Sequence, residues 1–173
     1  IDAPNALAYA PLIRPGVPIY DGFVPAEHVV ERVYVDDEAS VWLACNASGS
    51  WTSAILAMSV QGRTCVVADW VSENDPGIAL PEIASEAALE AGARNRLRMV
   101  CPQTHFNEWA NVGLVQAASR LQLDINQGGS LERGRAPRRR ELGRMSQGRA
   151  VVQIAERCRW TLNALAGGYA RKI

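Results

Sequence analysis

The sequence contains little of what zinc sites, disulfide frameworks and membrane spans are built from. Two histidines and four cysteines occur among its 173 residues, and the cysteines show no CxxC or other zinc-ligand spacing. Cys45, Cys65 and Cys101 lie in apolar, strand-like runs, which favours buried free thiols over disulfides. No apolar run approaches the roughly 18 residues that a membrane-spanning helix needs. These absences exclude a zinc ribbon and a helical membrane protein and argue against a disulfide scaffold.

The composition is that of an ordinary globular domain. A hydrophobic content of 48% with 21% charged residues, over 173 residues, favours one domain with a real core. Because the chain begins with Ile1 instead of Met, we expect it to be a piece of a longer protein. Five prolines in residues 1–26 predict an extended lead-in segment, followed by a single domain over residues 27–173. We expect His28 at the surface and most tryptophans in the core: Trp42, Trp51, Trp70, Trp109 and Trp160.

Charge is strongly segregated along the chain, although the net charge is zero. Residues 1–130 hold 15 acidic and 7 basic side chains, a balance of −8, and residues 131–173 hold 3 acidic and 11 basic ones, a balance of +8. Guanidinium groups match phosphate geometry, and no aromatic residues that would stack on single-stranded bases interleave the arginines. The cluster is therefore either a solvated helix face or, as we favour, a contact surface for DNA or another acidic partner. Its members are Arg133, Arg135, Arg138, Arg139, Arg140 and Arg144.

A change in the period of the hydrophobic pattern divides the domain into two parts. The first part consists of consecutive strands, and in the second part helices alternate with strands. Apolar runs over 40–45, 52–60 and 63–71 predict an antiparallel meander, with Gln61-Gly62 as a two-residue hairpin turn. An i, i+3, i+4 pattern from Leu80 to Ala91 predicts a helix with Pro81 in its first turn and Gly92 at its end. The order of elements indicates one α/β domain with a mixed sheet. The other expected elements are strands over 97–101, 121–125 and 150–154, and helices over 26–32, 109–121, 131–145 and 156–165.

Three residues at the ends of predicted strands form the candidate site. Asn46 closes an apolar run before a Ser/Gly turn, so it is either a weakened metal ligand or a turn residue. Asp69 ends a second apolar strand and either faces the same cleft or caps the following loop. Cys101 is best interpreted as a buried strand residue, because a nucleophilic pair with His105 would need that histidine aimed back past Pro102.

The order and spacing of several segments together resemble those of a known family. The segments are Val17–Phe23 with Pro25–His28, Trp42–Ile55, Val66–Trp70, Cys101-Pro102, and Arg157–Arg159 with Ala166–Tyr169. They resemble the C-terminal nuclease domain of the large terminase subunit of tailed bacteriophages. The resemblance implies a ribonuclease-H-like α/β fold, with a mixed sheet and flanking helices, that cuts DNA during packaging with Mg²⁺ or Mn²⁺ ions. It also implies double-stranded DNA, the terminase motor domain, the small terminase subunit and the portal as partners, in the host cell cytoplasm.

The chain departs from the pattern of that family at its central acids. Asn46 and Cys101 stand where the resemblance places catalytic acids, and the chain stops at Ile173, before the place of a third. Asn46 and Asp69 remain as the implied metal ligands, but an amide is a poor ligand for Mg²⁺ and a thiol does not favour it. We therefore expect a degenerate site with little or no cleavage, whose residues Asn46, Asp69 and Cys101–His105 converge at one edge of the sheet. The alternative is a non-catalytic module that docks DNA or protein through its arginine-rich segment.

Overall fold

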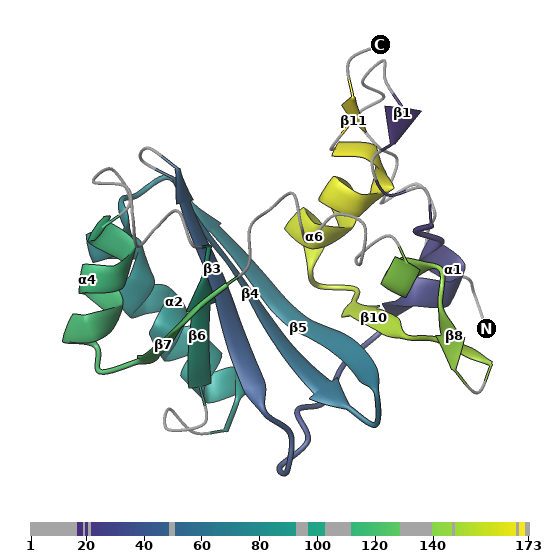
Figure 1. Cartoon of the computed structure of the whole chain (residues 1–173), viewed down its shortest axis with the longest axis horizontal. Helices are drawn as coiled ribbons and strands as arrows, with labels where there is room; N and C mark the ends of the chain where they lie inside the picture. Colours follow the sequence, from purple (N-terminus) through teal and green to yellow (C-terminus); the bar gives the residue numbers. More distant parts are fainter. Residues whose placement is uncertain are drawn as a thin grey trace.

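A computed structural model describes most of the chain, and a mixed sheet with helices on both faces dominates it (Figure 1). Within the described residues the main sheet has seven strands in the order β2-β10-β5-β4-β3-β6-β7. No helix in this part of the chain is both long enough and apolar enough to cross a membrane. The described residues are 17–18, 20, 22–48, 51–92, 97–102, 112–128, 140–146, 148–168 and 170–171.

The centre of the sheet is the predicted antiparallel meander. It consists of β3 (Val41–Ser48), β4 (Trp51–Val60) and β5 (Arg63–Ser72). Gln61 and Gly62 join β4 to β5 with φ values of 49° and 76°, as a type I′ hairpin turn requires. The meander was predictable because its period-2 alternation and its turn residues agree with each other.

Parallel strands extend the meander on both sides. On one side β6 (Leu97–Cys101) runs parallel to β3, and β7 (Asp124–Gln127) runs parallel to β6. On the other side β10 (Val152–Ala155) runs parallel to β5, and β2 (Val29–Val30) runs parallel to β10. The sheet is therefore mixed, which confirms the predicted fold class.

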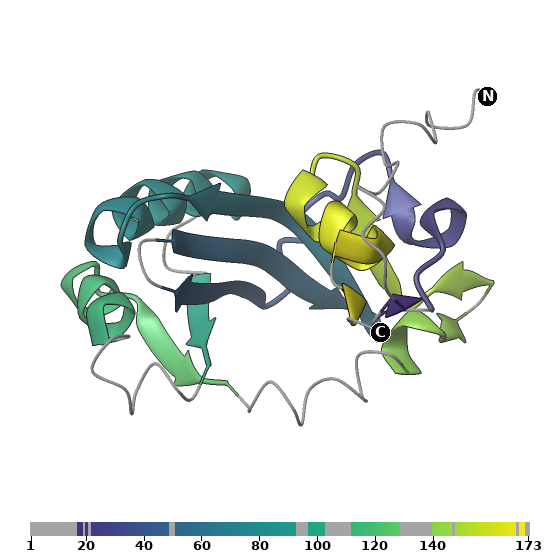
Figure 2. The same cartoon turned by 90° about the horizontal axis from the view of Figure 1, so that it is seen from above.

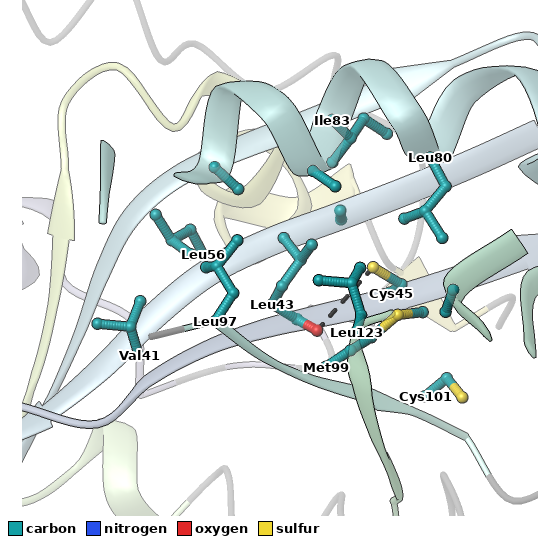
Figure 3. Close-up of a cluster of buried hydrophobic side chains, with 14 of the residues drawn as sticks. Val41, Leu43, Cys45, Leu56, Leu80, Ile83, Leu97, Met99, Cys101 and Leu123 are labelled. Atoms are coloured by element: carbon teal, nitrogen blue, oxygen red, sulfur yellow. Dashed lines mark hydrogen bonds between the residues drawn. The ribbon is translucent and has the colours of Figure 1, made fainter. Parts of the chain in front are cut away.

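Different helices cover the two faces of the sheet (Figures 1 and 2). The helices α2 (Pro76–Glu90) and α4 (Val112–Arg120) pack together on one face, over a core that includes Leu43, Leu56 and Met99 (Figure 3). The short helix α6 (Arg159–Asn163) continues into a π-helical segment η4 (Ala164–Gly168) on the other side. A second, smaller core lies there; its buried members are Val66, Ile154, Ala155, Cys158 and Leu162.

The second helix begins four residues before the first periodic residue, Leu80. Asp75 caps it by accepting hydrogen bonds from the backbone N–H groups of Gly77 and Ile78, at 2.8 and 3.3 Å. Pro76 takes the first helical position, where its missing N–H is harmless. Pro81 therefore lies inside the helix, and the prediction that it sits in the first turn is wrong. Gly92, at φ 75°, follows the helix end as predicted.

Several shorter elements have other bounds than predicted, because some of their predicted residues belong to a neighbouring strand or turn. The predicted helix 26–32 is only α1 (Pro25–His28), since Val29 joins the sheet in β2. The predicted strand 121–125 begins later, as β7, because Gln122 takes φ 56° in a turn after α4. The predicted strand 150–154 is broken at Val151 into β9 (Arg149–Ala150) and β10.

Two predicted helices are also shorter than expected. Of the predicted helix 131–145, residues 140–142 are helical, but β8 (Met145–Ser146) pairs with β9, and residues 131–139 lie outside the described part. The predicted helix 156–165 begins only at Arg159. A further small sheet pairs β1 (Val17–Pro18) with β11 (Ala170–Arg171), so segments from both ends of the chain lie side by side.

The burial of single residues tests the remaining predictions. All four cysteines are buried and free, as predicted. His28 is fully buried, so its surface assignment is wrong. Its ring nitrogens lie 2.8 Å from the carbonyl oxygens of Val24 and Leu142, which supply hydrogen-bond partners inside the protein. Trp51 and Trp160 are 48% and 56% exposed and do not belong to the core. Trp109 lies outside the described residues.

Candidate functional site

The candidate site residue Asn46 lies near the end of the central strand β3. It pairs with Ser53 of β4, and two residues earlier Ala44 pairs with Val100 of the parallel strand β6. Asn46 is exposed, whereas Cys45 beside it is buried under α2 and α4. Since successive side chains of a strand alternate between faces, Asn46 belongs to the sheet face opposite α2 and α4.

Cys101 is close to Asn46 in the sheet but faces the other way. It follows Val100, which pairs with Ala44, so Cys101 is level with Cys45 on the neighbouring strand. Both thiols belong to the core under α2 (Figure 3), and burial raises the pKa of each. This confirms the interpretation of Cys101 as a buried strand residue. A neutral thiol on the core face cannot share a metal with Asn46 on the opposite face.

Asp69 lies on the same sheet face as Asn46 but at a distance. It pairs with Ile55 of β4, and Ile55 pairs with Ala44, so all three side chains share one face. Asp69 is thus two strands and two residues away from Asn46. Standard strand spacing puts their Cα atoms about 12 Å apart. These positions lie toward one end of the sheet without forming one cluster of side chains.

The carboxylate of Asp69 is occupied by the start of α6. Its Oδ2 accepts a hydrogen bond from the backbone N–H of Thr161 at 2.6 Å. Burial raises the pKa of Asp69, while hydrogen bonds from Thr161 and from the Trp160 backbone partly offset the increase. Of the two predicted roles, capping is therefore the one that the contacts support, although the capped element is α6 and not the loop after β5.

The described residues do not fit a two-metal site. Such a site holds its ions about 4 Å apart with several carboxylates. In the described ranges no group of three or more His, Cys, Asp or Glu side chains is arranged to bind a metal ion. Asn46 supplies an amide, Asp69 holds α6, and Cys101 faces the core. His105 lies outside the described residues, so its predicted convergence with the site stays a prediction.

A hollow of about 270 Å³ lies beside Asp69, at the open edge of β5. The strand β10 pairs with β5 only as far as Val66, so the carbonyl of Val67 has no strand partner there and accepts the Nε–H of Arg157 at 2.8 Å. The same guanidinium donates to both oxygens of Glu90, at 2.6 and 2.7 Å. Hydrogen bonding to Arg157 lowers the pKa of Glu90. The residues lining the hollow are Ala68, Asp69, Trp70, Glu86, Leu89, Glu90 and Arg157.

Sequence reasoning missed this hollow. Arg157 is separated from Val67 by 90 residues and from Glu90 by 67, and no local pattern links them. Glu86 accepts the indole N–H of Trp70 at 2.6 Å, and helical spacing alone would have placed Glu86 and Glu90 on one side of α2. That spacing was the one available signal.

The two described arginines of the arginine-rich segment are exposed, whereas Leu142 between them is buried. Arg140 and Arg144 are both accessible, and Arg144 forms an ion pair of 2.6 Å with Glu141. The other four arginines of the predicted DNA-contact set, Arg133, Arg135, Arg138 and Arg139, lie outside the described residues.

Comparison with known proteins identifies the fold. No model of a protein family and no curated protein sequence matches the chain. The large terminase of a thermophilic bacteriophage matches over 90% of this chain and 40% of its own, with a TM-score of 0.65 and 12% identity. The complex of that terminase with ADP gives a TM-score of 0.66 at 13% identity, over 88% of this chain and 40% of its own. The large terminase nuclease of the thermophilic phage G20c matches over 84% and 77%, with a TM-score of 0.54 and 7% identity.

The chain has the ribonuclease-H-like fold of a terminase nuclease. This confirms the fold that the sequence resemblance implied. The chain spans about 40% of the length of the first of these large terminases. At 7 to 13% identity the likeness establishes the architecture, so the chemistry of this terminase-like domain rests on its own residues.

Proposed function

We propose that this chain is the nuclease-type domain of a DNA-packaging terminase large subunit, with an altered site that holds DNA without cutting it. The observation that carries the proposal is the position of Asn46. It stands near the end of the central strand β3, beside β6, where the resemblance assigns a catalytic acid. The terminase-like fold supports the packaging role.

The chemistry of the site residues supports binding over cleavage. An amide carries no charge to hold Mg²⁺ or Mn²⁺, but it both donates and accepts hydrogen bonds, which suits contact with a phosphodiester. Asp69 is committed to the backbone of Thr161, and Cys101 lies in the core. In this proposal neither metal supports hydrolysis by the domain. Metal-dependent cleavage would require ligands beyond Asn46 and Asp69.

The arginine-rich segment is proposed as the surface that contacts duplex DNA. Its six arginines in twelve residues can neutralise phosphates without reading the base sequence. The exposure of Arg140 and Arg144 supports this role. The motor domain, the small terminase subunit and the portal are the proposed protein partners, in the cytoplasm of the host cell.

A salt titration tests the DNA contact. Fluorescence anisotropy of a labelled duplex should show weak binding with little sequence preference and a steep loss of affinity as salt rises. Replacing Arg138, Arg139 and Arg140 with Ala should weaken binding on all sequences and flatten the salt slope by roughly one unit per lost contact. Arg120→Ala, at an exposed site on α4, is the matched control and should bind as the parent does. An unchanged affinity and slope in the triple variant would overturn the proposal for this segment.

A further inference from the structure

Two adjoining hollows form one groove around the C-terminal end of α2. The first is the hollow of about 270 Å³ beside Asp69, and the second has a volume of about 280 Å³. Leu89 and Glu90 line both hollows, so the two hollows adjoin at these residues. The second hollow extends the depression past the helix end to the segment before β3, where Arg32, Tyr34 and Asp37 line it. We name this depression the α2 groove.

Large apolar side chains at the rim of the α2 groove are highly exposed to solvent. Leu89 is 81% exposed and Tyr34 is 73% exposed, the two highest values among the large hydrophobic residues that the structure describes. The guanidinium of Arg32 lies 4.9 Å from the centre of the Tyr34 ring and holds one side of it. A leucine, a tyrosine and an arginine beside a hollow are the residue types expected of a protein-binding surface.

The electrostatics of the α2 groove favour a basic occupant. Four acidic residues and two arginines line it, a formal balance of −2, and one of the arginines, Arg157, is paired to Glu90 through both oxygens. The helix itself carries Glu82, Glu86 and Glu90 and no basic side chain. A partner segment with several guanidinium groups would therefore find complementary charge along the groove. The four lining acids are Asp37, Asp69, Glu86 and Glu90.

The chain itself contains a segment with the required chemistry. Residues 131–140, LERGRAPRRR, hold five arginines and one glutamate, and they begin with an apolar leucine. The charge balance of −8 over residues 1–130 and +8 over residues 131–173 makes the two parts of the chain complementary. We propose that the α2 groove binds residues 131–140, which hold five of the six clustered arginines, of a second copy of this chain.

The proposed contact is head-to-tail in the sense that it joins two different surfaces, a groove on one copy and a segment of another. Two copies can exchange segments reciprocally in a two-fold dimer, or successive copies can link into rings or open chains. The contact depends on charge, and salt should weaken it. It does not require the proposed packaging function. If the same arginines bind duplex DNA, however, DNA and the groove compete for them.

Self-association of the purified chain is the first test. Sedimentation equilibrium at low ionic strength should show a weight-average mass that rises with concentration above the 18.8 kDa of one chain and returns to it at high salt. Leu89→Lys removes the apolar contact and adds a repelling charge, and it should weaken association roughly tenfold or more. Ile78→Lys, at a 56% exposed site on the same helix and outside the groove, is the matched control and should associate like the parent.

A mixing experiment tests the head-to-tail geometry. The Leu89→Lys chain keeps its segment, and the chain with Arg138, Arg139 and Arg140 replaced by Ala keeps its groove. Each variant alone should stay monomeric, whereas an equimolar mixture should form a one-to-one complex. A labelled peptide of residues 131–140 should likewise bind the parent and not Leu89→Lys.

Three results would overturn the inference. They are a parent chain that stays monomeric at all concentrations, equal weakening by Leu89→Lys and Ile78→Lys, and variants that fail to complement each other. Occupation of the groove by the same chain's own segment gives the first of these results. Failure of DNA to compete with association would count against the proposed DNA contact and leave the self-association standing.

Discussion

Asp69 gives the sharpest prediction about stability, because one half-buried carboxylate joins β5 to α6. Its Oδ2 accepts the Thr161 N–H at 2.6 Å, so Asp69→Ala removes a cap-like, charge-assisted hydrogen bond. We expect a loss of about 1 to 2 kcal/mol in the free energy of unfolding. Asp69→Asn keeps an acceptor oxygen and the side-chain shape but removes the charge. The two variants together separate the hydrogen bond from the cost of burying a carboxylate.

The pH dependence of Asp69→Asn has a definite sign. Burial raises the pKa of Asp69 in the folded chain above its ordinary value of 3.8. The folded chain therefore binds the Asp69 proton more tightly than the unfolded chain does. The stability that this proton contributes to the parent is fully present below pH 3.8 and is lost as pH rises through the raised pKa of the folded state. We expect Asp69→Asn to gain stability relative to the parent between acidic and neutral pH.

Urea unfolding followed by tryptophan fluorescence, at a series of pH values, measures both effects. Asp75→Asn is the control, because it also removes a carboxylate while an asparagine still caps α2. At each pH, the change in the free energy of unfolding caused by Asp75→Asn is subtracted from the change caused by Asp69→Asn. The difference isolates the effect of the Asp69 carboxylate on stability. A parent chain that gains stability relative to Asp69→Asn as pH rises would contradict the expected sign. An Asp69→Ala chain that unfolds at the parent's urea midpoint would show that the hydrogen bond to Thr161 does not stabilise the fold.

Two further predictions concern long-range contacts of single side chains. Replacing the fully buried His28 with Ala leaves a cavity and removes the hydrogen-bond partner of the Leu142 carbonyl. We expect urea unfolding to show a loss of about 2 to 4 kcal/mol in the free energy of unfolding. A urea midpoint like that of the parent would contradict the described contacts. Arg157→Ala removes a partly exposed ion pair with Glu90 and the hydrogen bond to the Val67 carbonyl, and we expect about 1 kcal/mol from the same measurement. Arg157→Lys should restore only part of this loss, since an ammonium group cannot reproduce the guanidinium fork; full restoration would show that charge alone matters.

The parts of the fold that could be predicted are those in which local signals agree. The meander β3-β4-β5 was predictable because period-2 alternation and the Gln61-Gly62 turn indicate the same structure. The start of α2 was misplaced because two prolines compete for its first turn, and the cap at Asp75 decides in favour of Pro76. The surface assignment of His28 failed because its partner Leu142 is 114 residues away.

The sequence predicted which strands carry the candidate site residues better than it predicted the sheet face on which each side chain lies. A bulge between Leu56 and Ala57 shifts the pairing of β4 with β5. Without that shift, simple alternation would put Asp69 and Val66 on opposite faces, whereas both contact the α6 side. The orientation of Cys101 follows from its pairing with β3, which the sequence does not specify. The strands that carry these residues could therefore be predicted from the sequence, but the sheet face to which each side chain belongs could not.

Nicking of supercoiled plasmid DNA measures whether this chain has lost metal-dependent cleavage, as we propose. The purified chain, together with its Asn46→Ala and Asp69→Ala variants, is incubated with Mg²⁺ or Mn²⁺ and compared with a protein-free blank. We expect no metal-dependent nicking by any of the three, because Asn46 supplies no charge, Asp69 holds α6 and Cys101 faces the core. Metal-dependent nicking by the parent chain that either substitution abolishes would contradict the proposal.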